Sequence, residues 1–243
     1  MKFYWFGDSW VHGDELYNEL PRDSYQQHAF AQLVSDHYGA DCVNLGNVGE
    51  SVDVLPWRLE QVADQITDQD EVFFFLTADV RTMLFDDQGE LKKILPSPGF
   101  DSDSFHRYSE QWYRYFDSQP QRLYNYDRTV LLLYLWCCEI GVRAWFANIF
   151  TTQPQSMIDR VPEKAWLIAR DRCLAQAIFP IIDNNAGILI THDSESITVE
   201  QWHQQQPQLE LYMHPNHAHP NRAGHQRLAE YIIRCRNDKL GIS

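Results

Sequence analysis

Three short polar turns in the sequence hold residues that together could carry out acyl transfer. Gly7-Asp8-Ser9 directly follows the apolar segment 2–6, so Ser9 stands where a strand would give way to a helix. A second turn, at 44–51, contains Gly49, and a third, at 214–225, contains His214, His217, His219 and His225. A serine nucleophile, a histidine that accepts its proton and backbone N–H groups that bind an oxyanion are the components of this chemistry.

The segments that must position these turns alternate between strand and helix. Apolar runs predict strands at 2–6, 41–45, 71–76, 143–150 and 187–191. Helical spacing predicts helices at 25–38, 54–66, 106–118, 121–140, 163–179 and 221–235. This alternation predicts an α/β protein, a three-layer α/β/α sandwich with a mainly parallel, flavodoxin-like sheet of about five strands. Ligands bind at the carboxyl ends of such strands, where the polar turns would meet.

Residues 1–243 are predicted to form a single domain, because no segment has the composition of a linker. The alternating pattern is interrupted at 86–104, which holds two glycines and two prolines. We therefore expect an insertion at about 83–120 that covers the cleft. Aromatic residues at 108–116 follow the interruption. Core packing is their default role, and a stacking platform for sugars is the alternative.

The charge and hydropathy of the chain exclude several classes of partner. The 20 Lys and Arg against 34 Asp and Glu give a net charge of −14, which disfavours nucleic acids and anionic membranes. The longest apolar run, 130–138, is much shorter than the roughly 20 residues of a membrane span. The N-terminal apolar stretch is too short for a signal peptide, so we expect a cytoplasmic protein.

The cysteines do not have the pattern of a disulfide framework. There are 5 of them, with no CxxC pair, and Cys137 and Cys138 lie inside an apolar run. We expect buried, reduced thiols.

The polar turns together resemble the SGNH (GDSL-like) hydrolase family over nearly the whole chain. The first block of the family appears as Phe6-Gly7-Asp8-Ser9, and the second as the segment from Asn44 to Gly49. The last block, an acid followed by His-Pro-Asn, appears as the segment from Asn216 to Asn221. The resemblance implies Ser9 as nucleophile, Gly49 as an oxyanion donor and His219 as general base. It implies an esterase that needs no metal or organic cofactor.

Two positions depart from the family pattern. The third family block has an Asn that donates to the oxyanion, and the matching residue here is Ala78. Thr77 or Arg81 could fill that role. The acid of the triad is replaced by Asn216, which can orient the imidazole of His219 without stabilising its charged form. A Ser9–His219 dyad, or an acid from elsewhere such as Asp193, is the alternative.

Each candidate also has a purely structural interpretation. Ser9 could only cap a helix, Gly49 could only satisfy a turn, and Asp8 could bond nearby backbone amides. The histidines at 214, 217, 219 and 225 match no closed zinc pattern, so we expect no metal site. The leading hypothesis is a serine hydrolase of small-molecule or glycan O-acyl esters, with carbohydrate acetyl groups as one substrate class. The alternative is a catalytically impaired SGNH-like protein that binds a glycan or a partner.

Overall fold

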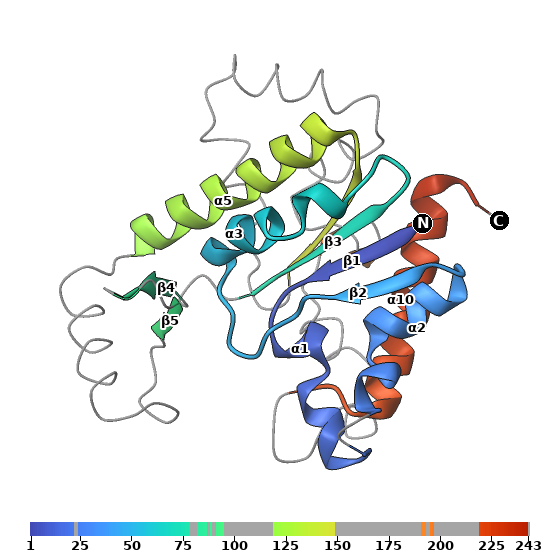
Figure 1. Ribbon diagram of the computed structural model, residues 1–243. Helices are drawn as coiled ribbons and strands as arrows, with labels where there is room; N and C mark the ends of the chain where they lie inside the picture. The colour runs from blue at the N-terminus through green and yellow to red at the C-terminus, as the bar shows by residue number, and fades with distance from the viewer. Residues whose placement is uncertain are drawn as a thin grey trace.

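The computed structural model contains a parallel β-sheet of four strands in its described residues. Those residues are 1–21, 24–77, 82–86, 88, 91–94, 119–148, 191–192, 195–196 and 219–242. The strands are β1 (Lys2–Phe6), β2 (Asp41–Asn44), β3 (Glu71–Leu76) and β6 (Arg143–Asn148), in the order β2-β1-β3-β6 (Figure 1). This result confirms the predicted α/β class and parallel sheet. The strand predicted at 187–191 lies outside the described residues except for Thr191.

Aromatic side chains hold the central strands together. Every residue of β3 is buried, which is expected of a strand covered on both faces. In the register of β1 and β3, Trp5 is paired with Phe73, and their rings are stacked with centroids 4.0 Å apart. Phe74 is likewise paired with Phe146 of β6, at 5.1 Å. Many of the aromatic side chains in the described residues therefore pack in the core.

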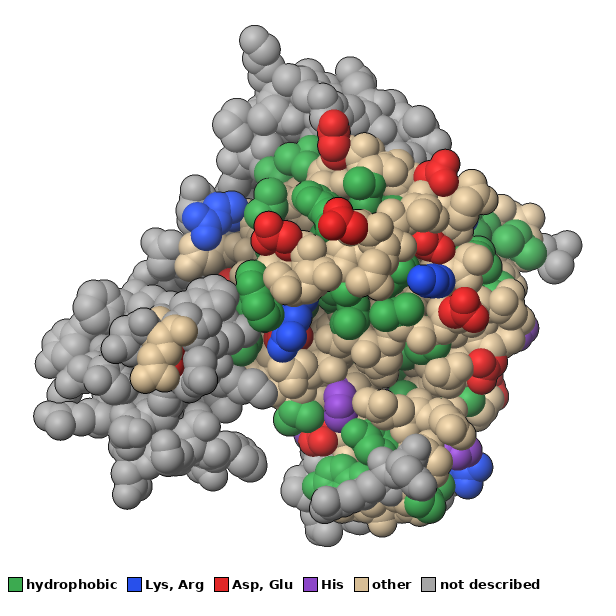
Figure 2. Space-filling model, in the orientation of Figure 1, with side chains coloured by type: hydrophobic (Ala, Val, Ile, Leu, Met, Phe, Trp, Pro, Cys, Tyr) green, Lys and Arg blue, Asp and Glu red, His purple; other side chains and the backbone are tan. Residues whose placement is uncertain are grey.

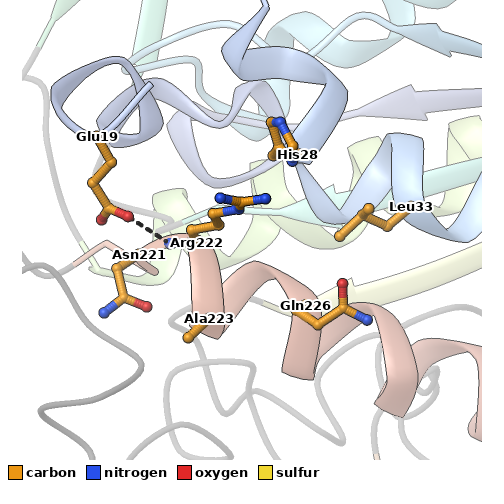
Figure 3. Close-up of a pocket in the computed structure, with 7 residues that line it drawn as sticks. All are labelled: Glu19, His28, Leu33, Asn221, Arg222, Ala223 and Gln226. Atoms are coloured by element: carbon orange, nitrogen blue, oxygen red, sulfur yellow. Dashed lines mark hydrogen bonds between the residues drawn. The ribbon is translucent and has the colours of Figure 1, made fainter. Parts of the chain in front are cut away.

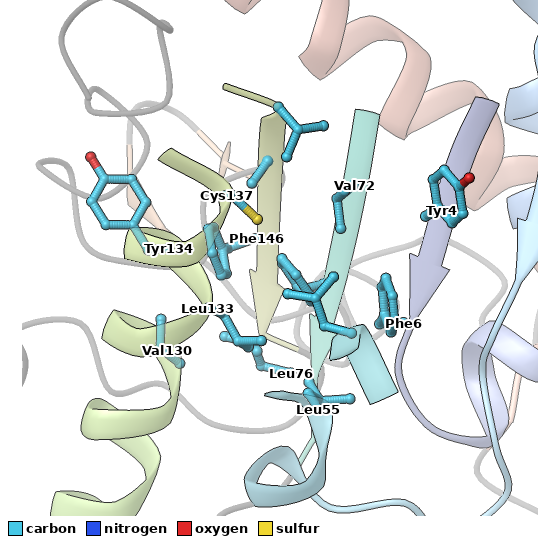
Figure 4. Close-up of a cluster of buried hydrophobic side chains, with 14 of the residues drawn as sticks. Tyr4, Phe6, Leu55, Val72, Leu76, Val130, Leu133, Tyr134, Cys137 and Phe146 are labelled. Atoms are coloured by element: carbon cyan, nitrogen blue, oxygen red, sulfur yellow. The ribbon is translucent and has the colours of Figure 1, made fainter. Parts of the chain in front are cut away.

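Helices α3 (Leu55–Glu60) and α5 (Gln119–Ile140) cover one face of the sheet (Figures 1 and 4). Alternate residues of the strands point to this side because successive side chains in a strand face opposite ways. Tyr4 and Phe6 of β1 therefore join a buried cluster with Leu55 of α3 and Leu133 of α5. Alternate residues of β3 and β6 complete the cluster.

The other face is covered by α1 (Ser9–His12), α2 (Phe30–His37) and α10 (Arg222–Leu240). Phe3 and Trp5 of β1 pack there with Phe30 of α2 and Ile232 of α10. The three layers predicted from the sequence are thus present. The remaining described elements are the 3₁₀ turns η1 (Asp14–Asn18), η2 (Tyr25–His28), η3 (Val52–Val54) and η4 (Ala63–Gln65), and the strands β4 (Thr82–Phe85), β5 (Leu91–Ile94), β7 (Thr191–His192) and β8 (Glu195–Ser196).

Two predicted helices are shorter than their sequence pattern suggested. The segment 25–38 divides into η2 and α2 because Ala29 between them is extended, with ψ 145°. The first backbone N–H of α2, on Phe30, donates to Nδ1 of His225 at 3.2 Å. A side chain from α10 therefore caps α2, which local periodicity does not reveal. The segment 54–66 likewise divides into η3, α3 and η4.

The described part of the predicted insertion at 83–120 forms an antiparallel hairpin of β4 and β5, followed by the start of α5. The helices predicted at 106–118 and 163–179 lie outside the described residues. The helix predicted at 121–140 corresponds to α5, and that at 221–235 corresponds to α10, for which Asn221 is the N-cap.

The cysteines differ from expectation at one position. Cys137 and Cys235 are buried free thiols, and Cys42 is a half-buried free thiol. Burial raises the pKa of Cys137, which keeps this thiol protonated. Cys138 is disulfide-bonded, so the expectation of a reduced thiol was wrong there. A disulfide depends on which segments meet in space, and spacing along the chain does not show this. Among the described helices, none is long and apolar enough to cross a bilayer.

Candidate active site

Ser9 lies at the carboxyl end of β1, as the first residue of the short helix α1. Gly7 makes the tight turn between the two elements possible. A Cβ atom on Gly7 would lie 2.6 Å from Cγ2 of Val11 and 2.9 Å from the carbonyl oxygen of Phe75. The chain therefore passes close to β3 just before the serine. Ser9 is only 4% exposed.

His219 comes to this position from the other end of the chain. It is half-buried and stands two residues before Asn221, whose side chain accepts a hydrogen bond from the backbone N–H of Gly224 and so caps α10. The Oγ atom of Ser9 lies 2.7 Å from Nε2 of His219. When Nε2 carries no proton, the serine hydroxyl donates to it. That is the arrangement in which an imidazole can activate a serine.

Trp10 is a residue of the site that the sequence analysis did not single out. Its buried indole lies beside the imidazole of His219, with ring centroids 6.3 Å apart. Its position immediately after Ser9 was the one feature of the sequence that could have indicated its place in the site.

Asp8 is fully buried and uses both carboxylate oxygens within the protein. Oδ1 accepts the backbone N–H of Trp10 at 3.1 Å, which makes Asp8 the N-cap of α1. Oδ2 accepts the hydroxyl of Thr77 at 3.0 Å. A carboxylate only accepts, so the single hydroxyl hydrogen of Thr77 points to Asp8. In this structure the hydroxyl is therefore directed at Asp8, and a role for Thr77 as the replacement oxyanion donor stays a prediction.

Gly49 lies in a tight turn that follows β2. The backbone N–H of Glu50 donates to the carbonyl of Asn47 at 3.0 Å, and Gly49 has φ +69°, a conformation that favours glycine. The loop is attached to the serine turn, because the N–H of Asn47 donates to the carbonyl of Gly7 at 3.0 Å. A Cβ on Gly46 would lie 2.6 Å from the backbone nitrogen of His12. The two turns that carry Gly49 and Ser9 are thus packed against each other.

Charged and polar side chains that follow Gly49 in the sequence connect its turn to neighbouring elements. Glu50 is buried and accepts the Nε–H of Arg58 at 2.8 Å. The carboxylate of Asp53 accepts the hydroxyl of Ser51 and, at 2.5 Å, the hydroxyl of Thr82. Because Thr82 begins β4, Asp53 connects the loop after β2 to the hairpin of the predicted insertion.

The remaining site candidates, Asn216 and Arg81, lie outside the described residues, as do Ala78 and the histidines at 214 and 217. Of the two described histidines from the cluster at 214–225, His219 faces Ser9 and His225 accepts the N–H of Phe30. Within the described residues there is no group of three His, Cys, Asp or Glu side chains placed to hold a metal ion.

A surface pocket of about 460 Å³ lies at the start of α10, and the sequence analysis did not anticipate it (Figure 3). Arg222 and Gln226 contribute from α10, Asn221 from the N-cap of α10, His28 from η2 and Glu19 from the residue that follows η1. The Glu19 carboxylate accepts the backbone N–H of Arg222 at 3.4 Å. The pocket brings together residues about 200 positions apart, so no local pattern could have indicated it.

Comparisons with known proteins support the fold. A carbohydrate esterase, whose structure is described as showing divergent catalytic and non-catalytic binding functions of the active site, matches with a TM-score of 0.51 and 14% identity, over 99% of this chain and 69% of that chain. A member of the lipolytic protein G-D-S-L family from Veillonella parvula DSM 2008 matches with a TM-score of 0.48 and 14% identity, over 96% and 97% of the two chains. The psychrotrophic esterase EstA from Pseudoalteromonas sp. matches with 0.48 and 12%, over 99% and 98%.

The chain therefore has the α/β fold of an esterase structure, as the resemblance to the SGNH family led us to expect. No family model and no curated protein matches the sequence. The similarity therefore lies in the three-dimensional fold. The site residues of this protein are assigned from its own sequence and structure.

Proposed function

We propose that this protein is a serine ester hydrolase of the SGNH (GDSL-like) type. The observation that carries the proposal is the 2.7 Å approach of Ser9 Oγ to His219 Nε2 at the carboxyl edge of a parallel sheet. In open α/β sheets this edge is where ligands bind. The packing of the Gly49 turn against the serine turn supports it, because acyl transfer needs backbone N–H groups near the nucleophile.

The reaction begins when Ser9 Oγ attacks the ester carbonyl and His219 Nε2 takes the hydroxyl proton. The carbonyl oxygen becomes an oxyanion, held by the backbone N–H groups of Ser9 and Gly49. The intermediate then collapses, the alcohol leaves with the proton from His219, and the acyl group stays on Ser9. Water attacks the acyl-enzyme with His219 as base, which releases the acid and restores the serine. In this scheme Asn216 orients His219, and Arg81 is a further group that could contact the oxyanion or the substrate.

The proposed substrates are O-acyl esters of small molecules or glycans, with carbohydrate acetyl groups as one class. The match to a carbohydrate esterase fold and the composition of the chain support this choice. On the described part of the face in Figure 2, acidic side chains are scattered among neutral ones, and the net charge is −14. Such a surface favours neutral ligands over polyanions. A cytoplasmic location stays a prediction. A disulfide at Cys138 argues against it, because disulfides are typical of oxidising compartments.

Hydrolysis of p-nitrophenyl acetate tests the proposal. Ser9→Ala and His219→Ala should each lower kcat/KM by at least about 10³-fold, because the two side chains act as a unit. Ser24→Ala and His37→Ala, which change the same residue types away from the site, should keep full activity. Hydrolysis by the wild type that survives both substitutions at the site would contradict the proposal.

The second candidate function is binding without efficient turnover. Ala78 stands where the family has its oxyanion Asn, and loss of one oxyanion donor typically costs about 10²–10³ in kcat. Glycan binding that is unchanged in Ser9→Ala, together with no hydrolysis by the wild type, would favour this candidate.

A further inference from the structure

We infer that Thr77 is a positioning residue for the nucleophile and acts on Ser9 through Asp8. This inference rests on the proposed function and deepens it. Thr77 immediately follows β3, and Asp8 immediately precedes Ser9. The hydrogen bond from Thr77 Oγ1 to Asp8 Oδ2, at 3.0 Å, joins segments that are 69 residues apart in the sequence.

The contacts of Asp8 fix the backbone that carries Ser9. One carboxylate oxygen accepts a hydrogen bond from the N–H of Trp10, so the turn that these two residues close contains Ser9. The other oxygen accepts a hydrogen bond from the hydroxyl of Thr77 and joins this turn to the end of β3. Asp8, Ser9 and Thr77 are 0%, 4% and 2% exposed. Water therefore cannot readily replace the threonine, and a carboxylate that lost this donor would turn toward another one.

The position of Ser9 matters because its hydroxyl has to meet two partners at once. It must stay within hydrogen-bond distance of His219 and must also reach the ester carbonyl. A shift of about 1 Å in such a geometry can cost on the order of 100-fold in rate. A group that only positions the nucleophile should change kcat and leave KM nearly unchanged.

A set of substitutions separates this role from a merely structural one. Thr77→Val removes the hydroxyl and keeps the branched shape, and it should lower kcat about 10- to 100-fold with KM within about twofold. Thr77→Ser restores the donor and should recover most of that loss. Thr129→Val, at another buried threonine on α5, is the matched control and should leave kcat unchanged.

A double-mutant cycle tests the route through Asp8. If Thr77 acts through the carboxylate, Thr77→Val combined with Asp8→Ala should be no slower than Asp8→Ala alone. If the threonine instead contacts the oxyanion, the two losses should multiply. Multiplicative losses, or a Thr77→Val variant with wild-type kcat, would overturn the inference while leaving the proposed esterase intact.

Hydrogen exchange gives a readout that does not depend on turnover. In the full-length protein, amide exchange in residues 7–13 should be faster in Thr77→Val than in the wild type, and near wild type in Thr77→Ser. Unchanged exchange in Thr77→Val would also overturn the inference. A wild type that hydrolyses no ester but shows the expected exchange would refute the esterase and retain Thr77 as the residue that holds the turn.

Discussion

Arg236 of α10 donates two hydrogen bonds to Glu71, the first residue of β3, at 3.0 Å from Nε and 2.6 Å from Nη2. Both side chains are buried, and Arg143 and Trp145 of β6 donate to the same carboxylate. The Glu71 cluster lies at the amino end of the strands, opposite Ser9. Because α10 begins three residues after His219, the ion pair fixes the far end of the helix that delivers the histidine.

Removal of one partner from this buried cluster should destabilise the fold strongly. Arg236→Met leaves the Glu71 carboxylate buried with fewer donors, and we expect a loss of about 3–5 kcal/mol in the free energy of unfolding, measured by urea denaturation. Arg227→Ala is the control, since Arg227 and Glu230 pair on the surface with side chains 48% and 51% exposed. That change should cost at most about 1 kcal/mol. Equal effects of the two substitutions would show that the cluster does not hold α10.

Substitution of Gly49 should reduce both stability and activity, whereas substitution of Gly39 should reduce stability alone. Gly49 has φ +69° and Gly39, at the end of α2, has φ +63°. An alanine in either position should cost about 1–2 kcal/mol of stability from the left-handed backbone. Gly49→Ala should also lower kcat, because the proposed oxyanion N–H moves. If esterase activity is lost equally in both variants, the Gly49 N–H has no special role.

Asp70 should contribute stability that acid removes. Burial raises the pKa of its carboxyl group. Hydrogen bonds from the N–H of Lys2 and from the N–H and hydroxyl of Thr67 lower the pKa, and together they outweigh burial, so the net shift is downward from 3.8. The unfolded chain therefore takes up a proton more readily than the folded one. The contribution is complete above the unfolded pKa and disappears as the pH falls through the lower folded pKa.

The measurement for Asp70 is the free energy of unfolding as a function of pH in the wild type and in Asp70→Asn. The variant should be less stable at pH 7, and its deficit should shrink as the pH drops below about 4. Asp68→Asn, at an exposed neighbour, is the control and should follow the wild type. A deficit that stays constant down to pH 3 would mean that the ionised carboxylate is not what stabilises this turn.

The elements that the sequence predicted well are those determined by local chemistry. β1 and β3 have the predicted bounds, because dense apolar runs between polar turns leave little choice of where a buried strand begins and ends. The helix predicted from residue 221 begins one residue later in the structure, at Arg222, with Asn221 as its N-cap. The break between η2 and α2 could not be predicted, because the acceptor for the N–H of Phe30 is His225, 195 residues away.

The candidate site shows the same limit. Polar residues at strand ends pointed to Ser9, and the resemblance to the SGNH family selected His219 among the histidines at 214–225. The structure places these two side chains within hydrogen-bond distance. The task of Thr77 could not be read from the sequence, since a hydroxyl beside a strand end could face the oxyanion or the Asp8 carboxylate.

Labelling with a fluorophosphonate probe tests the central claim most directly, because the probe forms a bond with an activated serine whatever the natural ester is. The proposal requires that the intact wild-type protein gains one probe adduct, that peptide mass spectrometry places it on Ser9, and that Ser9→Ala gains none. His219→Ala should react at least about 100-fold more slowly, since it lacks the general base. A folded wild type that leaves Ser9 unlabelled, or labelling of Ser9 that is indifferent to His219, would contradict the account.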